Sequence, residues 1–256
     1  MGLKRREYYC ARWTNLPNGA MAICVSYPKS GRTWLRTMFA ELGVTMSFTH
    51  LDTGHNNSAW GKPVERIDIP RVDADKVVFL HRDPRDTVVS YFYETTIRQK
   101  PNRLRSIKFW LQRKTAPPEM SQFVRSRRFG IEKVIVFNLL CAEHLRALPV
   151  AYEALNENAV ESLTEILRYI DQPVSEQRIR EVVENNAFAK MQKREANGEY
   201  GKRGLQARDP TNPNSYKVRR GKVGGWRDEL DSQTQTFANE MLERYDYFER
   251  IRGLIG

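Results

Sequence analysis

The stretch VSYPKSGRTWLRTMF (residues 25–39) decides how the first part of the chain folds. The apolar run at residues 21–27 predicts a buried strand, and residues 33–42 carry apolar side chains at helical spacing, with Gly43 as the stop. A strand that feeds a tight turn and then a helix points free backbone N–H groups at one spot, where the helix dipole adds positive potential. The sequence therefore predicts an anion-binding loop between this strand and this helix.

The residues of the loop can add donors of their own. Gly31 allows the backbone to approach a ligand closely. Lys29 adds a positive charge, and Ser30 and Thr33 add hydroxyl groups. The loop nevertheless differs from G-x-x-x-x-G-K-[ST], which holds nucleoside triphosphates. A triphosphate site would also need an acidic residue at the end of a neighbouring strand, to hold Mg²⁺.

The clearest predicted buried strand, KVVFLH at residues 76–81, ends beside a cation instead. Arg82 follows the strand directly, before Asp83, and its planar guanidinium suits a phosphate group. We expect the next helix to begin with Asp86 as its N-cap, which places the Ser90 hydroxyl in the first turn. Two anion sites on neighbouring strand ends predict a ligand that is phosphorylated at two separated positions.

Strands and helices alternate along the chain, which indicates an α/β fold. We expect a single domain over residues 1–256, with a mostly parallel central sheet that helices flank on both faces. The other predicted elements are strands at residues 44–49 and 150–155, a helix that Asn156 or Asn158 caps and that ends near residue 171, and helices at residues 175–185 and 232–248. Residues 193–220 are rich in Gly, Pro, Asn and basic side chains, and they predict a long functional loop.

Three motifs in order resemble those of the PAPS-dependent sulfotransferases of the cytosolic type. YPKSGRTW (residues 27–34) is similar to the family's 5′-phosphosulfate loop, RDPRDTVVSYFY (residues 82–93) to its 3′-phosphate motif, and RRGKVGGW (residues 219–226) to its C-terminal motif. The resemblance implies a fold like that of the P-loop kinases. It also implies transfer of a sulfuryl group from 3′-phosphoadenosine 5′-phosphosulfate (PAPS) to a hydroxyl or amine, without a metal and with 3′,5′-diphosphoadenosine (PAP) as product.

The resemblance also implies which residues bind the co-substrate. They are Lys29, Ser30, Gly31, Arg32, Thr33, Trp34, Arg82, Ser90, Tyr152, Phe188, Arg219, Arg220 and Gly221. Trp34 would stack on the adenine and Phe188 would flank it, although Phe188 and Tyr152 are equally compatible with a place in the core. Arg32 stands where the family has Thr, and its longer side chain either reaches the phosphosulfate or blocks it. Residues 193–220 would form a mobile lid over the co-substrate.

Sulfuryl transfer needs charge neutralisation and a general base. Lys29 is expected to stabilise the leaving phosphate, and histidine suits proton transfer from an acceptor hydroxyl at neutral pH. SFTH (residues 47–50) ends the second predicted strand as Lys-Thr-His does in the cytosolic branch, so His50 is the first candidate base and His55 the second. Phe48 stands where that branch has Lys, and one hypothesis is that Arg32 supplies the missing cation.

The chain is strongly basic, with a formal net charge of +11. Residues 98–128 alone carry ten basic side chains and one acid. Two interpretations stay open: a solvated face, or a groove for an anionic acceptor such as an acidic or sulfated saccharide. The acceptor is expected to be a small molecule, a lipid or a saccharide. Nucleic-acid binding is not expected, because no basic motif interleaved with aromatics is present.

Other features narrow the class of protein. Three cysteines without metal-ligand spacing predict no metal site and a reducing compartment. No run approaches the ~18 apolar residues of a membrane span, so we expect a cytoplasmic protein. Two alternative functions remain: a nucleotide or small-molecule kinase on a related fold, and a relative that binds the nucleotide without catalysing transfer.

Overall fold

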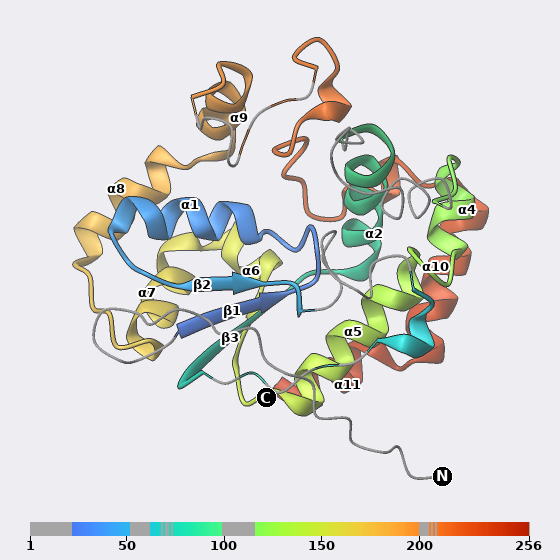
Figure 1. Cartoon of the computed structure of the whole chain (residues 1–256), viewed down its shortest axis with the longest axis horizontal. Helices are drawn as coiled ribbons and strands as arrows, with labels where there is room; N and C mark the ends of the chain where they lie inside the picture. The colour runs from blue at the N-terminus through green and yellow to red at the C-terminus, as the bar shows by residue number, and fades with distance from the viewer. Residues whose placement is uncertain are drawn as a thin grey trace, which may run out of the picture.

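The described part of the chain is built around four parallel strands in the computed structural model (Figure 1). The residues described are 22–51, 62–67, 69, 72, 74–98, 116–199, 205, 207 and 209–255. The strands are β1 (Ala22–Ser26), β2 (Ser47–Thr49), β3 (Lys76–His81) and β4 (Leu148–Ala151), in the order β2-β1-β3-β4. Val25 of β1 pairs with Thr49 of β2 and with Phe79 of β3. The parallel sheet confirms the predicted α/β class.

Helices connect the strands and cover both faces of the sheet (Figure 1). In chain order they are α1 (Arg32–Leu42), η2 (Val64–Arg66), α2 (Pro84–Tyr93), η3 (Glu94–Arg98), α4 (Met120–Arg125), α5 (Ile131–His144), α6 (Tyr152–Glu157), α7 (Ala159–Tyr169), α8 (Glu176–Asn185), α9 (Phe188–Ala196), η5 (Pro213–Ser215), η6 (Gly225–Asp228), α10 (Ser232–Arg244) and α11 (Tyr247–Ile255). Within the described ranges, no helix has the length and apolar character needed to cross a membrane.

The sheet separates two apolar cores. Ile23 and Val25 of β1 join the core that includes α2, α5, α10 and α11, whereas Ala22 and Cys24 join the core that includes α1, α7 and α8. Successive residues of a strand point to opposite faces, so a strand with helices on both faces is apolar throughout. This arrangement explains the continuous apolar runs of β1 and β3.

The helix after β3 begins earlier than predicted. α2 starts at Pro84, whose fixed φ and missing N–H suit the first helical position, and Asp83 is the N-cap, accepting the N–H of Arg85 at 2.8 Å. The prediction of Asp86 as the cap was therefore wrong. Ser90 consequently lies in the second turn of α2 rather than in its first.

Four other predicted boundaries also differ from the structure. The strand predicted at residues 44–49 begins only at Ser47. The predicted strand at residues 150–155 is too long, because Tyr152 already begins α6. The predicted helix at residues 232–248 is broken into α10 and α11, with Asp246 between them at a φ of 47°, in the left-handed region that interrupts a helix. Residues 193–196, the first part of the predicted loop, instead complete α9.

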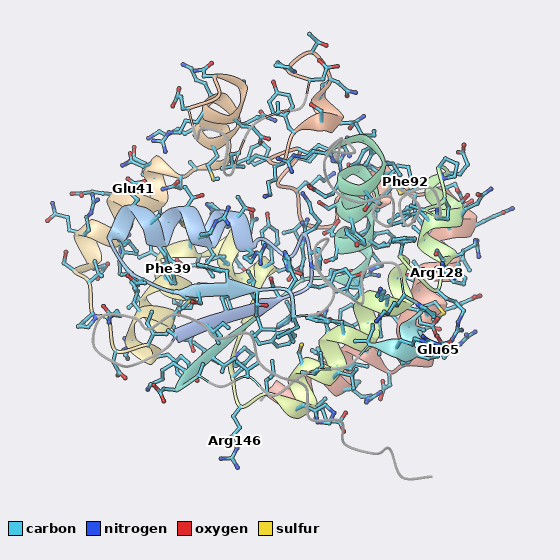
Figure 2. All side chains as sticks on the ribbon, viewed as in Figure 1. Phe39, Glu41, Glu65, Phe92, Arg128 and Arg146 are labelled. Carbon is cyan, nitrogen blue, oxygen red and sulfur yellow. The ribbon has the colours of Figure 1, made fainter. Side chains whose placement is uncertain are left out.

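Side-chain hydrogen bonds join α1 to the end of α8. Glu41 lies in the last turn of α1 (Figure 2). Its carboxylate accepts the side-chain amides of Asn185 and Asn186, each at 2.8 Å. The Trp34 indole N–H donates to the Asn186 carbonyl at 2.9 Å. Both ends of α1 are thereby fixed to one neighbour, which holds the N-terminal turn of α1 in place at the edge of the sheet.

Candidate active site

The loop between β1 and α1 has the features of an anion site. Gly31 has a φ of 99°, in the region that favours glycine, and a Cβ there would lie 2.4 Å from the Tyr152 ring. Gly31 is the N-cap of α1 and has no side chain that could form a capping hydrogen bond, and the first turn of α1 carries no acidic residue. No side chain therefore caps the backbone N–H groups of this turn, which face the loop. The buried Ser30 hydroxyl has no hydrogen-bond partner within the described ranges. These groups suit an anionic ligand.

Lys29, the expected catalytic cation, lies against a buried carboxylate. Its Nζ donates to Oε2 of Glu94 at 3.1 Å, and Arg98 donates to Oε1 of the same carboxylate at 3.0 Å. Burial lowers the pKa of Lys29, and the negative charge of Glu94 opposes this effect. Glu94 directly follows the second sequence motif and was not among the predicted site residues.

His50 lies where β2 ends, beside the same loop. Its Nδ1 is 2.8 Å from the carbonyl oxygen of Ser26, the last residue of β1. A carbonyl oxygen only accepts, so Nδ1 carries the proton of the neutral ring and Nε2 is the basic nitrogen. The structure thus brings His50 and Lys29 to the same edge of the sheet. His55, the second candidate base, lies outside the described residues.

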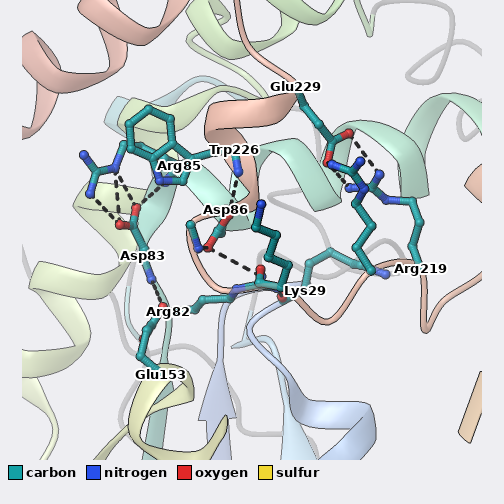
Figure 3. A network of polar contacts seen from close by, with 12 residues as sticks. Lys29, Arg82, Asp83, Arg85, Asp86, Glu153, Arg219, Trp226 and Glu229 are labelled. Atoms are coloured by element: carbon teal, nitrogen blue, oxygen red, sulfur yellow. Dashed lines mark hydrogen bonds and ion pairs between the residues drawn. The ribbon is translucent and has the colours of Figure 1, made fainter. Parts of the chain in front are cut away.

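Arg82 lies at the end of β3, next to the first loop (Figure 3). Its Nη1 donates to the Lys29 carbonyl at 3.5 Å and its Nη2 to the Lys222 carbonyl at 3.3 Å. The guanidinium carbon stacks 4.3 Å from the centre of the Tyr152 ring. Its buried Nε has no partner among the residues described. Because a guanidinium offers five N–H donors, two long hydrogen bonds leave donors for an anion.

Polar side chains spaced by four residues follow one face of α2 and η3, and we call them the polar stripe. Its members are Arg82, Asp86, Ser90, Glu94 and Arg98. Residues four apart on a helix lie above one another. Ion pairs close both ends, with 3.7 Å between Arg82 and Asp86 and 3.0 Å between Arg98 and Glu94. The polar stripe therefore runs from the second anion site to the carboxylate that holds Lys29.

The Asp86 carboxylate binds the C-terminal motif (Figure 3). Its Oδ2 accepts the N–H of Gly224 at 2.7 Å and its Oδ1 accepts the N–H of Trp226 at 3.0 Å. Asp86 is 4% exposed. The two hydrogen bonds bring the third sequence motif against the second, although Asp86 and Gly224 are 138 residues apart in the chain.

Arg219 and Arg220 of this motif have different surroundings. Arg219 donates to both oxygens of Glu229, at 2.9 and 2.6 Å, and its guanidinium carbon lies 4.0 Å from the centre of the Tyr93 ring (Figure 3). Arg220 is exposed and lies 3.4 Å from Asp228. The motif therefore offers one fixed guanidinium and one that is solvated.

Two aromatic residues of the expected nucleotide site each pack on a glycine of a loop. Tyr152 is buried against Gly31, as described above. Phe188 packs on Gly221, which has a φ of 62° and where a Cβ would lie 2.3 Å from the ring. Phe188 is 39% exposed, which is unusual for a core aromatic. Trp34 lies edge-on to Tyr152, with 6.2 Å between the ring centres.

Arg32 and Thr33 begin α1 and are both half-buried. Burial lowers the pKa of Arg32 to about 10, and the guanidinium of Arg36, one turn further along α1, lowers it as well. Two cations therefore lie one turn apart on the first two turns of α1. Ser90, on α2, is also half-buried.

Lys217 is a further cation near this site that the sequence did not single out. Its backbone N–H and that of Val218 donate to the buried Glu195 carboxylate at 2.7 and 2.8 Å. Burial lowers the pKa of Lys217 to about 7, while Glu94 raises it and Lys29 lowers it. The backbone at Lys217 and Val218 is thereby held against α9, and the charge of Lys217 responds to Lys29 and Glu94.

A polar pocket of about 360 Å³ lies next to the end of the polar stripe. Thr96 and Ile97 of η3 line one side, and Asp209, Asn212 and Ser215 line the other. Four of these five side chains are polar, so the pocket suits a ligand with hydrogen-bonding groups.

Asp83 is the acid that a kinase would need at the end of β3. Its carboxylate is bound to Arg85, which donates from Nε at 3.0 Å and from Nη2 at 2.6 Å, and it also caps α2. Within the ranges that the structure describes, no group of three or more His, Cys, Asp or Glu is arranged to hold a metal ion.

The fold and the site define an α/β protein with groups suited to an anion at the carboxyl ends of parallel strands. Residues 71–250 match the family described as Sulfotransferase domain, and this match spans more than half of the chain. The chain therefore belongs to the sulfotransferase family and is an enzyme of that class. The match does not include the Lys29 loop.

Solved structures with a similar fold include mouse sulfotransferase SULT7A1 complexed with PAP, which is 18% identical with a TM-score of 0.55 over 92% of this chain and 87% of that chain. Retinol dehydratase in complex with androsterone and PAP is 15% identical, with a TM-score of 0.52 over 88% and 80%. Retinol dehydratase with retinol and PAP is 17% identical, with a TM-score of 0.53 over 88% and 80%. No curated protein matches the sequence. The TM-scores show that these proteins share the fold of this chain.

Proposed function

We propose that this enzyme transfers the sulfuryl group of PAPS to a hydroxyl or amine of a small acceptor. The observation that carries the proposal is the meeting of two anion-binding loops at adjacent strand ends, where Arg82 donates to the carbonyl of Lys29. A nucleotide with phosphates on both its 3′ and 5′ positions is a ligand of the kind that two such sites require. Three structures of similar fold contain PAP, which is such a nucleotide.

We assign the 5′ side of the co-substrate to the first loop. The N–H groups at the start of α1, with Ser30, Gly31 and Thr33, would bind the 5′-phosphate. Lys29 would lie at the oxygen that bridges phosphorus and sulfur. Arg32 would add a second positive charge on this side, in place of the lysine that Phe48 replaces.

The 3′-phosphate and the adenine are assigned to the second and third motifs. Arg82 and Ser90 would bind the 3′-phosphate, and Arg219, Arg220 and Gly221 would close over it. The residues assigned to the adenine are Trp34, Tyr152 and Phe188. The exposure of Phe188 and its contact with Gly221 support this role for Phe188 more than a place in the core.

The chemical step is an in-line displacement at sulfur. The acceptor oxygen forms a bond to sulfur while the bond between sulfur and the bridging oxygen of the 5′-phosphate breaks. His50 Nε2 takes the proton of the acceptor hydroxyl, and Lys29 neutralises the negative charge that develops on the leaving phosphate. The Nδ1–H bond to Ser26 supports His50 in this role, because it leaves Nε2 as the base.

The acceptor is proposed to be a polar molecule. The pocket beside the polar stripe offers hydroxyl, amide and carboxylate groups, which suit an alcohol or a saccharide more than a flat apolar ring. An anionic acceptor stays a prediction, because residues 99–115 of the basic segment lie outside the described residues. The single domain and the lid at residues 193–220 likewise stay predictions.

The test is a transfer assay with labelled PAPS and a panel of phenols, alcohols, amines, lipids and saccharides. Wild-type enzyme should sulfurylate at least one class, and His50→Ala should lose transfer by about 100-fold or more, the usual contribution of a general base. His144→Ala is the matched control, since His144 is exposed at the end of α5. PAP should bind His50→Ala almost as tightly as wild type. Retained turnover in His50→Ala would remove His50 as the base.

A further inference from the structure

We infer that Asp86 is a positioning residue that gives this enzyme its preference for nucleotides with a 3′-phosphate. The role rests on the proposed function, because it concerns the same nucleotide site. Asp86 would act through Arg82 and through the C-terminal motif, without touching the nucleotide itself.

The first observation is that the Asp86 carboxylate accepts hydrogen bonds from a segment that is distant in the sequence. Both of its oxygens accept backbone N–H groups, of Gly224 at 2.7 Å and of Trp226 at 3.0 Å, and the carboxylate is almost fully buried. Such charge-assisted bonds are stronger than neutral ones. Asp86 is therefore the residue of α2 that binds the backbone of the C-terminal motif, next to the ring contacts of Arg219 with Tyr93 and of Arg85 with Trp226.

The second observation is that Asp86 holds Arg82 without using its donors. The closest approach of the two side chains is 3.7 Å, which is an ion pair but too long for a hydrogen bond. The guanidinium is held in orientation by this charge, by the Tyr152 ring and by the carbonyls of Lys29 and Lys222. Its Nε, which has no partner within the described ranges, stays available to an anion.

The third observation is that Arg82 and Asp86 form hydrogen bonds with residues close together in the third motif. Lys222, whose carbonyl accepts from Arg82, lies two residues before Gly224, whose N–H donates to Asp86. Arg82 and Asp86, which Figure 3 labels, thus both bind one short segment of the third motif. Loss of the Asp86 carboxylate would release that segment and remove the charge that orients Arg82.

A purely structural role would give a different result from a positioning role. An anchor that only holds the fold together would, when lost, weaken every nucleotide alike. A residue that positions the 3′-phosphate groups would, when replaced, weaken binding of PAP and leave AMP, which has only the 5′-phosphate, nearly unchanged. The ratio of the two affinities is therefore the quantity to measure.

The variant is Asp86→Asn, which keeps the shape of the side chain but replaces one acceptor with a donor and removes the charge. Isothermal titration of PAP and of AMP into wild type and variant should show PAP affinity falling by about tenfold or more, as expected for hydrogen bonds to a charged group, with AMP within about twofold. Asp83→Asn is the matched control. It lies at the start of the same helix, Asn also caps helices, and its carboxylate accepts from Arg85 instead of from the backbone of the C-terminal motif.

Each outcome separates the inference from the proposed function. If wild type binds PAP no tighter than AMP, the proposed function fails. If wild type prefers PAP and Asp86→Asn keeps that preference, or loses both nucleotides equally, the role of Asp86 is refuted while the proposed function stands. Adding Arg82→Ala to Asp86→Asn should cost little further PAP affinity if both act on one phosphate, whereas additive losses would contradict the coupling.

Discussion

Each end of the polar stripe contains a carboxylate beside a guanidinium, and the two carboxylates bind different partners. At one end the Asp86 carboxylate binds two backbone N–H groups and leaves Arg82 with unused donors. At the other end the Glu94 carboxylate binds the cations themselves, Lys29 at 3.1 Å and Arg98 at 3.0 Å. One end is therefore organised for an anion in advance, whereas the other holds its cation on a carboxylate that an anion must replace.

This difference indicates a division of labour between binding and chemistry. A preorganised guanidinium gives affinity at little cost in ordering, which suits the non-reacting 3′-phosphate. A lysine that exchanges a carboxylate for the leaving phosphate gives its full effect only when charge develops there, which suits the reacting 5′ side. We therefore expect changes at the Arg82 end to alter nucleotide affinity and changes at the Lys29 end to alter turnover.

The largest expected effect is that of Lys29→Met. The variant keeps the length of the side chain but removes the charge that neutralises the leaving phosphate, so kcat should fall by about 100- to 1,000-fold. PAP affinity should change far less, since the backbone N–H groups and Arg82 remain. Lys190→Met, at an exposed lysine of α9, is the matched control in steady-state assays. A loss of affinity without a loss of kcat would reverse the division of labour.

A smaller effect is expected for Glu94→Gln, seen in the pH dependence. Burial lowers the pKa of Lys29 and Glu94 raises it, so removing the negative charge lowers this pKa further. Lys29 must be protonated to act, and the alkaline limb of kcat/KM should therefore move to lower pH. Above this limb kcat/KM should be lower in Glu94→Gln than in wild type, and the two enzymes should converge at lower pH, where Lys29 is protonated in both. An unchanged alkaline limb, with Glu184→Gln as the surface control, would show that Glu94 does not set the charge of Lys29.

The smallest expected effect is that of Lys217→Arg. With a pKa of about 7, Lys217 is charged below neutral pH and loses its charge above it, so its attraction for an anion falls as pH rises from 6 to 8. Arginine stays charged over this range. The loss of PAP affinity from pH 6 to pH 8 should therefore be about threefold smaller in Lys217→Arg than in wild type. The phosphate of PAP itself titrates near pH 6 in both proteins and cancels in the comparison. Equal pH profiles would place Lys217 outside the nucleotide site.

Local sequence signals predicted those parts of the fold that local chemistry decides. β1, α1 and β3 follow from apolar periodicity and from Gly43, which ends α1 in the left-handed conformation. The Asp83-Pro84 pair was an available signal for the true start of α2, because Asp is a common N-cap and Pro a common first helical residue. Asp86 instead binds backbone N–H groups that lie more than a hundred residues away in the chain.

The parts of the site that the sequence did not predict depend on contacts between distant segments. Glu94 meets Lys29 across 65 residues, and Glu195 fixes Lys217 from a separate helix. The residues of each contact lie far apart in the sequence, so helical or strand periodicity does not reveal either contact. The four-residue spacing of Arg82, Asp86, Ser90 and Glu94 was visible in the sequence. That these side chains form one row follows only from the structure, in which α2 carries Asp86 and Ser90, Arg82 precedes it and Glu94 follows it.

The central claim is that two separated phosphate sites replace the metal-bound triphosphate site of a kinase. PAP and ADP test it most directly, because they are isomers. PAP carries one phosphate on the 3′ position and one on the 5′ position, whereas ADP carries both phosphates as a 5′-diphosphate. Isothermal titration without Mg²⁺ should show PAP binding about 100-fold tighter than ADP or more, the effect of engaging a second charged site. Equal affinities, or an ADP affinity that exceeds that of PAP once Mg²⁺ is added, would contradict the claim and favour the kinase.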